Sequence, residues 1–221
     1  MFNDFFANLP FYLMRIPVML LALTVHETAH GWMAYKLGDP TARNLGRLTL
    51  NPLKHLDPIG TLCMILFGFG WAVPVPINSR YFKNGRRDMA LSAAAGPASN
   101  LLMGFVGVFL YCLYVKLFFQ QIVAGSIMAY VVLLFLQVFY TMNLSFAMFN
   151  LLPIPPLDGS RLLFIFLPDK LYFGLMKYER YIVLVMLALL WFTDIFTAPL
   201  TFLVKAAENG MFKLIELLPF F

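Results

Sequence analysis

Residues 24–32, TVHETAHGW, place two histidines and a glutamate inside a long apolar run. His26 and His30 are four residues apart, so on a helix their imidazoles share one face. That spacing lets both rings bind one zinc ion, while Glu27 would face the water at the metal rather than the metal itself. In H-E-x-x-H sites the glutamate is the general base of a peptidase. The segment predicts zinc-dependent peptide hydrolysis, with two histidine ligands and Glu27 as the base.

A structural interpretation of the same segment is two helix-packing histidines beside a capping glutamate. The surrounding residues, FYLMRIPVMLLAL before and MAY after, are long and apolar enough to enter a membrane. Ionisable side chains within membrane helices are energetically costly and are functional by default. This setting favours the metal site over the packing interpretation.

A catalytic zinc needs a third protein ligand and leaves one position open for water. The chain has three histidines in all, so the candidates are one histidine and the aspartates near the predicted membrane: His55, Asp57, Asp158 and Asp194. Asp158 closes NLLPIPPLDG, at the predicted depth of the histidine pair, where several prolines would interrupt a helix. We favour Asp158 as the third ligand and expect one zinc ion per chain. We place the other candidates in loops or near the outer interface.

Composition indicates a membrane protein. Of the 221 residues, 61% are hydrophobic and 12% are charged, whereas soluble domains are about half apolar and about a quarter charged. The net charge of +5 does not indicate nucleic-acid binding, because the basic residues lie in short loops between apolar runs. We expect one domain over residues 1–221, with a catalytic core over about 10–160, C-terminal helices over 161–221 and no soluble domain.

The apolar runs predict an all-α polytopic helix bundle of four to five spans. We expect spans at about 10–36, 88–118, 123–152 and 180–204, and a fifth if 161–178 inserts. Residues 60–76, GTLCMILFGFGWAVPVP, are too rich in Gly and Pro for a spanning helix and predict a re-entrant, β-hairpin-like element.

Basic residues predict the orientation. Twelve of the sixteen Lys and Arg residues fall into three groups: Lys36, Arg43, Arg47 and Lys54; Arg80, Lys83, Arg86 and Arg87; Arg161, Lys170, Lys177 and Arg180. The loop between the second and third spans offers only Lys116. The positive-inside rule then places the three groups, and the histidine end of the first span, at the cytoplasmic face.

Three motifs together resemble the site-2 protease family of intramembrane zinc metalloproteases: HETAH, GPASN and NLLPIPPLDG, in this order on successive predicted spans. The resemblance covers about residues 20–160. The stretch GDPTARNLGRLTLNPLKHLDPIG further resembles a short bacterial and archaeal subgroup without PDZ or CBS domains. This implies a multi-pass protein of a prokaryotic cytoplasmic membrane, with its active site toward the cytoplasm.

The resemblance also implies roles for single residues. His26, His30 and Asp158 would bind zinc, and Glu27 would be the base. Asn150 would steady the substrate carbonyl or its oxyanion. Asn100 would contact the substrate backbone, with helix packing as an equal alternative.

The region 60–76 resembles the family's membrane-embedded hairpin, whose edge could hold an unwound substrate as an added strand. We therefore expect an endopeptidase that cleaves transmembrane segments of other proteins. The alternative is a non-catalytic membrane metal transporter or scaffold. Transporters tend to place ion sites at mid-membrane between repeats, and this chain shows neither feature.

Overall fold

The computed structural model describes residues 9–58, 60, 73–168, 171, 174 and 177–219. Five long helices dominate this part of the chain: α2 (Leu9–Lys36), α5 (Gly85–Val123), α6 (Ile127–Asn150), α9 (Glu179–Phe192) and α10 (Thr197–Glu216). Shorter elements connect them: α3 (Thr41–Asn44), η1 (Pro52–Lys54), η2 (Ser79–Tyr81), α7 (Asp158–Leu163) and η3 (Phe164–Phe166). The described residues form no β-strand.

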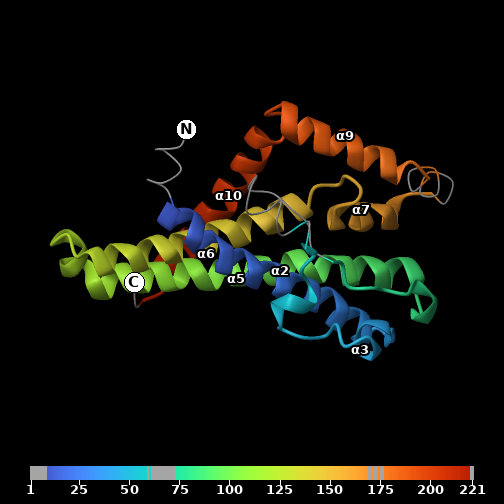
Figure 1. Ribbon diagram of the computed structural model, residues 1–221, viewed down its shortest axis with the longest axis horizontal. Coiled ribbons are helices and arrows are strands. Elements are labelled where there is room, and N and C mark those ends of the chain that lie inside the picture. The colour runs from blue at the N-terminus through green and yellow to red at the C-terminus, as the bar shows by residue number, and fades with distance from the viewer. Residues whose placement is uncertain are drawn as a thin grey trace.

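Helices α5 and α6 lie side by side along the long axis of the molecule, and α2 packs against both (Figure 1). The turn between α5 and α6 is short, which makes the two helices antiparallel neighbours. Gly125 adopts a positive φ of 76° in this turn, and the Ser126 side chain accepts a hydrogen bond from the Ala129 amide to cap α6. The three helices α2, α5 and α6 form the framework on which the candidate site is built.

Small residues let α5 and α6 approach closely. A Cβ placed on Gly104 would lie 2.7 Å from the Leu144 side chain, and one on Gly107 would lie 2.7 Å from that of Phe139. Glycine at such positions brings helix backbones together, as is common between membrane helices. The close α5–α6 contact therefore depends on these two glycines.

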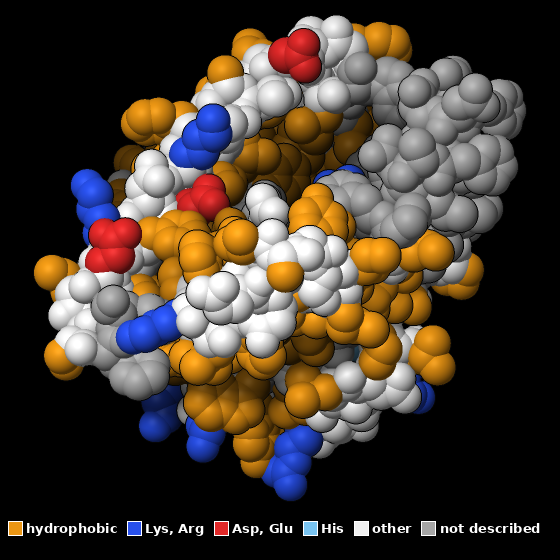
Figure 2. Space-filling model, turned by 90° about the vertical axis from the view of Figure 1, so that its left-hand side faces the viewer, with side chains coloured by type: hydrophobic (Ala, Val, Ile, Leu, Met, Phe, Trp, Pro, Cys, Tyr) orange, Lys and Arg blue, Asp and Glu red, His pale blue; other side chains and the backbone are white. Residues whose placement is uncertain are grey.

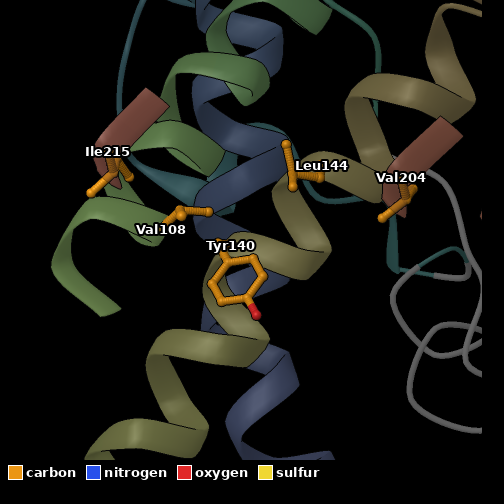
Figure 3. Packing of buried hydrophobic residues seen from close by; sticks show 5 residues of the cluster. All are labelled: Val108, Tyr140, Leu144, Val204 and Ile215. Atoms are coloured by element: carbon orange, nitrogen blue, oxygen red, sulfur yellow. The ribbon is translucent and has the colours of Figure 1, made fainter. Parts of the chain in front are cut away.

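Helix α10 completes a hydrophobic core with this pair of helices. The buried cluster consists of Val108, Tyr140, Leu144, Val204 and Ile215, contributed by α5, α6 and α10 (Figure 3). The Tyr140 hydroxyl donates a hydrogen bond of 3.0 Å to Glu208 on α10. Apolar contact and this polar link together dock α10 on the helix pair.

Two helices among the described residues, α5 and α6, are long and apolar enough to cross a membrane. Both expose large apolar side chains, including Leu102 (64% exposed), Leu117 (61%) and Ile127 (81%). Figure 2 shows hydrophobic side chains over much of one face and lining a deep hollow in it. Exposed apolar surface on this scale needs a covering, which lipid would supply.

Comparison with the predicted spans gives one correction. Helices α2, α5 and α6 match the first three predicted spans to within a few residues. The expected single helix over 180–204 is wrong, because the chain breaks between α9 and α10 and Thr193 is extended. At this break the Asp194 carbonyl accepts a hydrogen bond from the Thr197 amide. Pro199 suits the first turn of the helix that follows.

Two further expectations fall largely outside the described residues. Of the predicted re-entrant element, residues 61–72 are not described. Residues 73–76 form neither helix nor strand, and the Val73 amide donates a hydrogen bond to the His55 carbonyl. Of the region 161–178, α7 and η3 are described through Phe166 and only scattered residues follow.

Candidate metal centre

His26, His30 and Asp158 converge from two distant parts of the chain. The Nε2 atoms of the two imidazoles lie 2.9 Å apart, and Asp158 Oδ2 lies 3.1 Å from the first and 3.2 Å from the second. Both histidines are buried, at 6% exposure, and Asp158 is partly buried. Among the described residues this is the group of three side chains suited to hold a metal ion.

In both imidazole rings the Nδ1 atom faces a hydrogen-bond acceptor. His30 Nδ1 lies 2.7 Å from the Ser92 carbonyl, an acceptor only, so this nitrogen must carry a proton. His26 Nδ1 lies 2.6 Å from Asn100 Oδ1 and donates to it in the same way. In the neutral rings both Nε2 atoms then present lone pairs to each other and to a carboxylate oxygen. Three electron-pair donors with no proton between them form a site for a cation.

The dimensions suit zinc. A Zn–N bond of about 2.0–2.1 Å in tetrahedral geometry implies about 3.3 Å between neighbouring ligand atoms. The observed separations of 2.9–3.2 Å lie just below that value. Two imidazoles and one carboxylate are also a donor set used by catalytic zinc sites, with the fourth position left for water.

Asp158 is the first residue of α7 and follows the break at the end of α6. A Cβ on Gly159 would lie 2.2 Å from the Leu151 carbonyl oxygen, so only glycine lets the chain fold back here. Asp158 Oδ2 faces the Nε2 atoms of both imidazoles. A carboxylate in this position adds an anionic oxygen to the two imidazole nitrogens, which suits a divalent cation.

Helix α5 approaches the imidazoles at Gly96, within the GPASN segment. A Cβ at this position would lie 2.3 Å from His30 Nε2 and 2.7 Å from His26 Cε1. No side chain fits in that space without displacing the rings. Gly96 and the Ser92 carbonyl therefore bring α5 against the metal-binding edge of α2.

Glu27 is half-buried and lies next to the pair in α2. Its Oε2 accepts a hydrogen bond of 2.8 Å from the Val75 amide. Neighbouring residues 74 and 76 are prolines and have no amide proton, so Val75 is the donor that this segment offers here. Arg47 holds the same segment by donating to the Val73 carbonyl at 2.6 Å. The segment thereby fixes one carboxylate oxygen of Glu27 and leaves the other available.

The two asparagines of interest lie differently. Asn100 is fully buried; its oxygen faces His26, and its nitrogen donates to the Ala22 carbonyl (3.2 Å) and to Asn143 Oδ1 (3.0 Å). Asn150 is partly buried, and its nitrogen donates to the Phe146 carbonyl of its own helix at 3.0 Å. The structure therefore joins Asn100 to a histidine and shows Asn150 bonded within α6.

The other candidate ligands make different contacts. His55 is buried, and its Nε2 lies 2.9 Å from the Thr49 carbonyl. Asp57 accepts from the Gly60 amide at 2.7 Å, and the exposed Asp194 begins the turn before α10. None of the three belongs to the group around His26 and His30.

Sequence reasoning missed three contributors: the Ser92 carbonyl, Gly96 and Asn143. A backbone carbonyl leaves no residue-specific signal. Gly96 was visible only as part of a small-residue segment. Asn143 did have a signal, since an amide in the middle of an apolar run has to find a partner.

Comparisons with known proteins agree on one family. Residues 115–193, which include Asn150 and Asp158, match the model of Peptidase family M50. Over 213 residues the chain is 39% identical to "Putative zinc metalloprotease YwhC" of Bacillus subtilis (strain 168), covering 96% of this chain and 95% of that protein.

A second relative is "Putative zinc metalloprotease Rip2" of Mycolicibacterium smegmatis. It is 31% identical over 153 residues, which cover 67% of this chain and 55% of that protein. No solved structure matches the chain.

Proposed function

Because the chain belongs to peptidase family M50, the site-2 protease family, we propose that this zinc metalloprotease is an intramembrane endopeptidase. Its substrates are transmembrane segments of other proteins, cleaved near the cytoplasmic face. The observation behind the proposal is the convergence of three side chains suited to bind a metal ion, between helices whose outer surfaces are apolar. His26, His30 and Asp158 hold the zinc in this proposal.

Zinc, when bound, supplies a Lewis acid that acidifies water and polarises a carbonyl group. Glu27 accepts the proton of the attacking water at the carboxylate oxygen that Val75 does not occupy. The proton then passes to the departing amine. Asn150 has two amide protons and uses one of them for Phe146, so the second can be donated to the substrate carbonyl.

Of the two roles expected for Asn100, substrate contact and helix packing, the proposal adopts a role inside the protein. Its side-chain oxygen and nitrogen both form hydrogen bonds within the protein, and the residue is fully buried. In the proposal Asn100 therefore supports His26 and does not touch substrate.

The setting of the reaction is a prokaryotic cytoplasmic membrane, crossed several times by one domain. The exposed apolar side chains of α5 and α6 support a lipid-facing position, and the basic loops support the orientation. A substrate helix must unwind before its carbonyls can react, since they are hydrogen-bonded within the helix. A site near the cytoplasmic edge gives water access to the exposed bond.

The test is Glu27→Gln compared with wild type. Glutamine is nearly isosteric and can still accept a hydrogen bond from Val75, but it cannot take a proton at neutral pH. We expect full zinc content and loss of proteolysis. Cleavage is measured by profiling new peptide termini in membranes of cells that express either form.

Three results would contradict this proposal. Wild-type cleavage by Glu27→Gln would remove Glu27 as the base. New termini that lie only in soluble domains, and never within apolar spans, would remove the membrane substrate class. Zinc binding without any proteolysis in the wild type would instead favour a transporter or scaffold.

A further inference from the structure

A line of amide groups leads from α6 to the metal-binding edge of α2. Asn143 donates through Nδ2 to the Phe139 carbonyl of its own helix at 2.8 Å. This contact turns Asn143 Oδ1 toward α5, where it accepts from Asn100 Nδ2 at 3.0 Å. Asn100 Oδ1 is thereby directed at His26 Nδ1, 2.6 Å away. Each amide orientation follows from the preceding one.

The orientation of Asn100 decides which nitrogen of His26 can bind metal. When its oxygen faces Nδ1, that nitrogen is protonated and Nε2 is free to bind. When the amide is reversed, its NH₂ faces Nδ1, so Nδ1 must be an acceptor and the neutral ring carries its proton on Nε2. The reversed state blocks the metal-binding atom.

Two acceptors oppose this reversal. One is the Ala22 carbonyl on α2, and the other is Asn143 Oδ1 on α6. A reversed Asn100 would turn its oxygen against both of these oxygens, which is electrostatically unfavourable in a site of low polarity. Asn143 is 0% exposed, so no solvent competes for its contact.

We propose that Asn143 is a positioning residue of the metal centre. It acts through Asn100 to hold His26 in the tautomer that presents Nε2 to zinc. The inference rests on the proposed metal site and adds helix α6 to its support. Partners that orient metal-binding histidines are worth roughly 10- to 100-fold in metal affinity when removed.

The primary variant is Asn143→Leu, which keeps the approximate volume and removes the amide. Purified protein is compared with wild type in two measurements. The first is zinc affinity, by competition with a chelator. The second is the ¹⁵N chemical shift of the histidine ring nitrogens in the zinc-free protein, which distinguishes the two neutral tautomers. With three histidines in the chain, these signals can be assigned by single substitutions.

Asn143→Leu should weaken zinc binding by roughly 10- to 100-fold and give mixed tautomers of His26. The matched control is Ser145→Ala on the same helix, which removes a hydroxyl that donates to the Thr141 carbonyl and has no link to His26. Its zinc affinity should match wild type. Leu144→Ala, which opens the buried cluster without touching this amide line, controls for loss of stability.

A double-mutant cycle tests whether Asn143 acts through Asn100. In an Asn100→Ala background, adding Asn143→Leu should change zinc affinity by no more than about twofold, because the link is already broken. Asn143→Asp keeps an oxygen to accept from Asn100 and, in its protonated form, also a donor for Phe139. It should recover most of the lost affinity, and it is the variant to use if Asn143→Leu does not fold.

The outcomes separate this inference from the proposed metal site. Wild-type zinc affinity and an unchanged tautomer in Asn143→Leu would overturn the inference, as would full additivity in the cycle. A loss in Asn143→Asp as large as in Asn143→Leu would also overturn it. Failure of the metal site itself has a different signature: full zinc retention in His30→Ala.

Discussion

Two ring protons determine what His26 and His30 can do. Both protons are held on Nδ1, one by a backbone carbonyl and one by an amide oxygen. Without those acceptors each neutral ring could place its proton on Nε2 and bind no metal through that atom. The chemistry of the H-E-x-x-H segment on α2 thus depends on α5 as much as on the histidines themselves.

The ligand assignment predicts zinc content directly. We expect about one zinc per wild-type chain and strong loss in His30→Ala and Asp158→Ala, since two remaining ligands seldom hold zinc against water. His55→Ala is the matched control, because His55 contacts the Thr49 carbonyl and lies outside the three-residue group. Elemental analysis of folded, purified protein measures the result. Zinc retained by Asp158→Ala and lost by His55→Ala would reassign the third ligand.

Asn150 should affect catalysis and leave the metal in place. Its amide is bonded within α6 at 3.0 Å and has one proton to spare for substrate. Asn150→Ala should keep full zinc content and lose activity by about 100-fold, since one oxyanion donor contributes on the order of 3 kcal/mol. The measurement is kcat on a cleaved substrate, with zinc assayed on the same preparation. Zinc loss in this variant would make Asn150 a structural residue.

At the scale of elements, the approach of α5 to α2 makes the site. Gly96 allows that approach, because its missing Cβ is the space that the two imidazoles fill. Ser92 and Asn100 lie on the same helix, one turn to either side, and hold the two rings. One helix face thus supplies the space and both acceptors.

Gly96→Ala should therefore abolish zinc binding while α5 still forms. Alanine favours a helix over glycine by about 1 kcal/mol, but its methyl group would lie 2.3 Å from His30 Nε2. The matched control is Gly85→Ala at the start of the same helix, where an added Cβ meets nothing within 4 Å. Zinc content and helicity by circular dichroism measure the outcome. Wild-type zinc in Gly96→Ala would show that the rings can move aside.

Local patterns explain what the sequence could predict of these elements. The histidine spacing and the long apolar runs are local, so α2, α5 and α6 were placed to within a few residues. Gly96, Ser92 and Asn143 matter through the register of three helices, which no local pattern encodes. The break before α10 was missed for another reason. The hydropathy of a long apolar run hardly changes over a short turn such as the one closed by Asp194 and Thr197.

At the scale of the whole molecule, helix lengths predict the depth of the site in the proposed membrane setting. At 1.5 Å per residue, α6 with 24 residues is about 36 Å long, close to the thickness of a bilayer core. Asn100 precedes Val123, the last residue of α5, by 23 residues, and because α5 kinks at Phe118 the two lie at most about 35 Å apart. In the proposed membrane setting, these lengths predict that the site lies at the edge of the membrane opposite the α5–α6 turn.

The basic residues then predict which edge this is. The segments that follow α2 and precede α5 are rich in Lys and Arg, whereas the α5–α6 turn has Lys116 nearby and no other basic residue. Reporters fused after Lys54 or Lys83 should therefore be cytoplasmic, and one inserted near Gln121 should be external. Paired alkaline phosphatase and fluorescent-protein fusions measure this, because each is active on one side only. A cytoplasmic signal at Gln121 would instead place the metal centre at the outer face. The basic segments that follow α2 and precede α5 would then also lie outside, which contradicts the positive-inside rule.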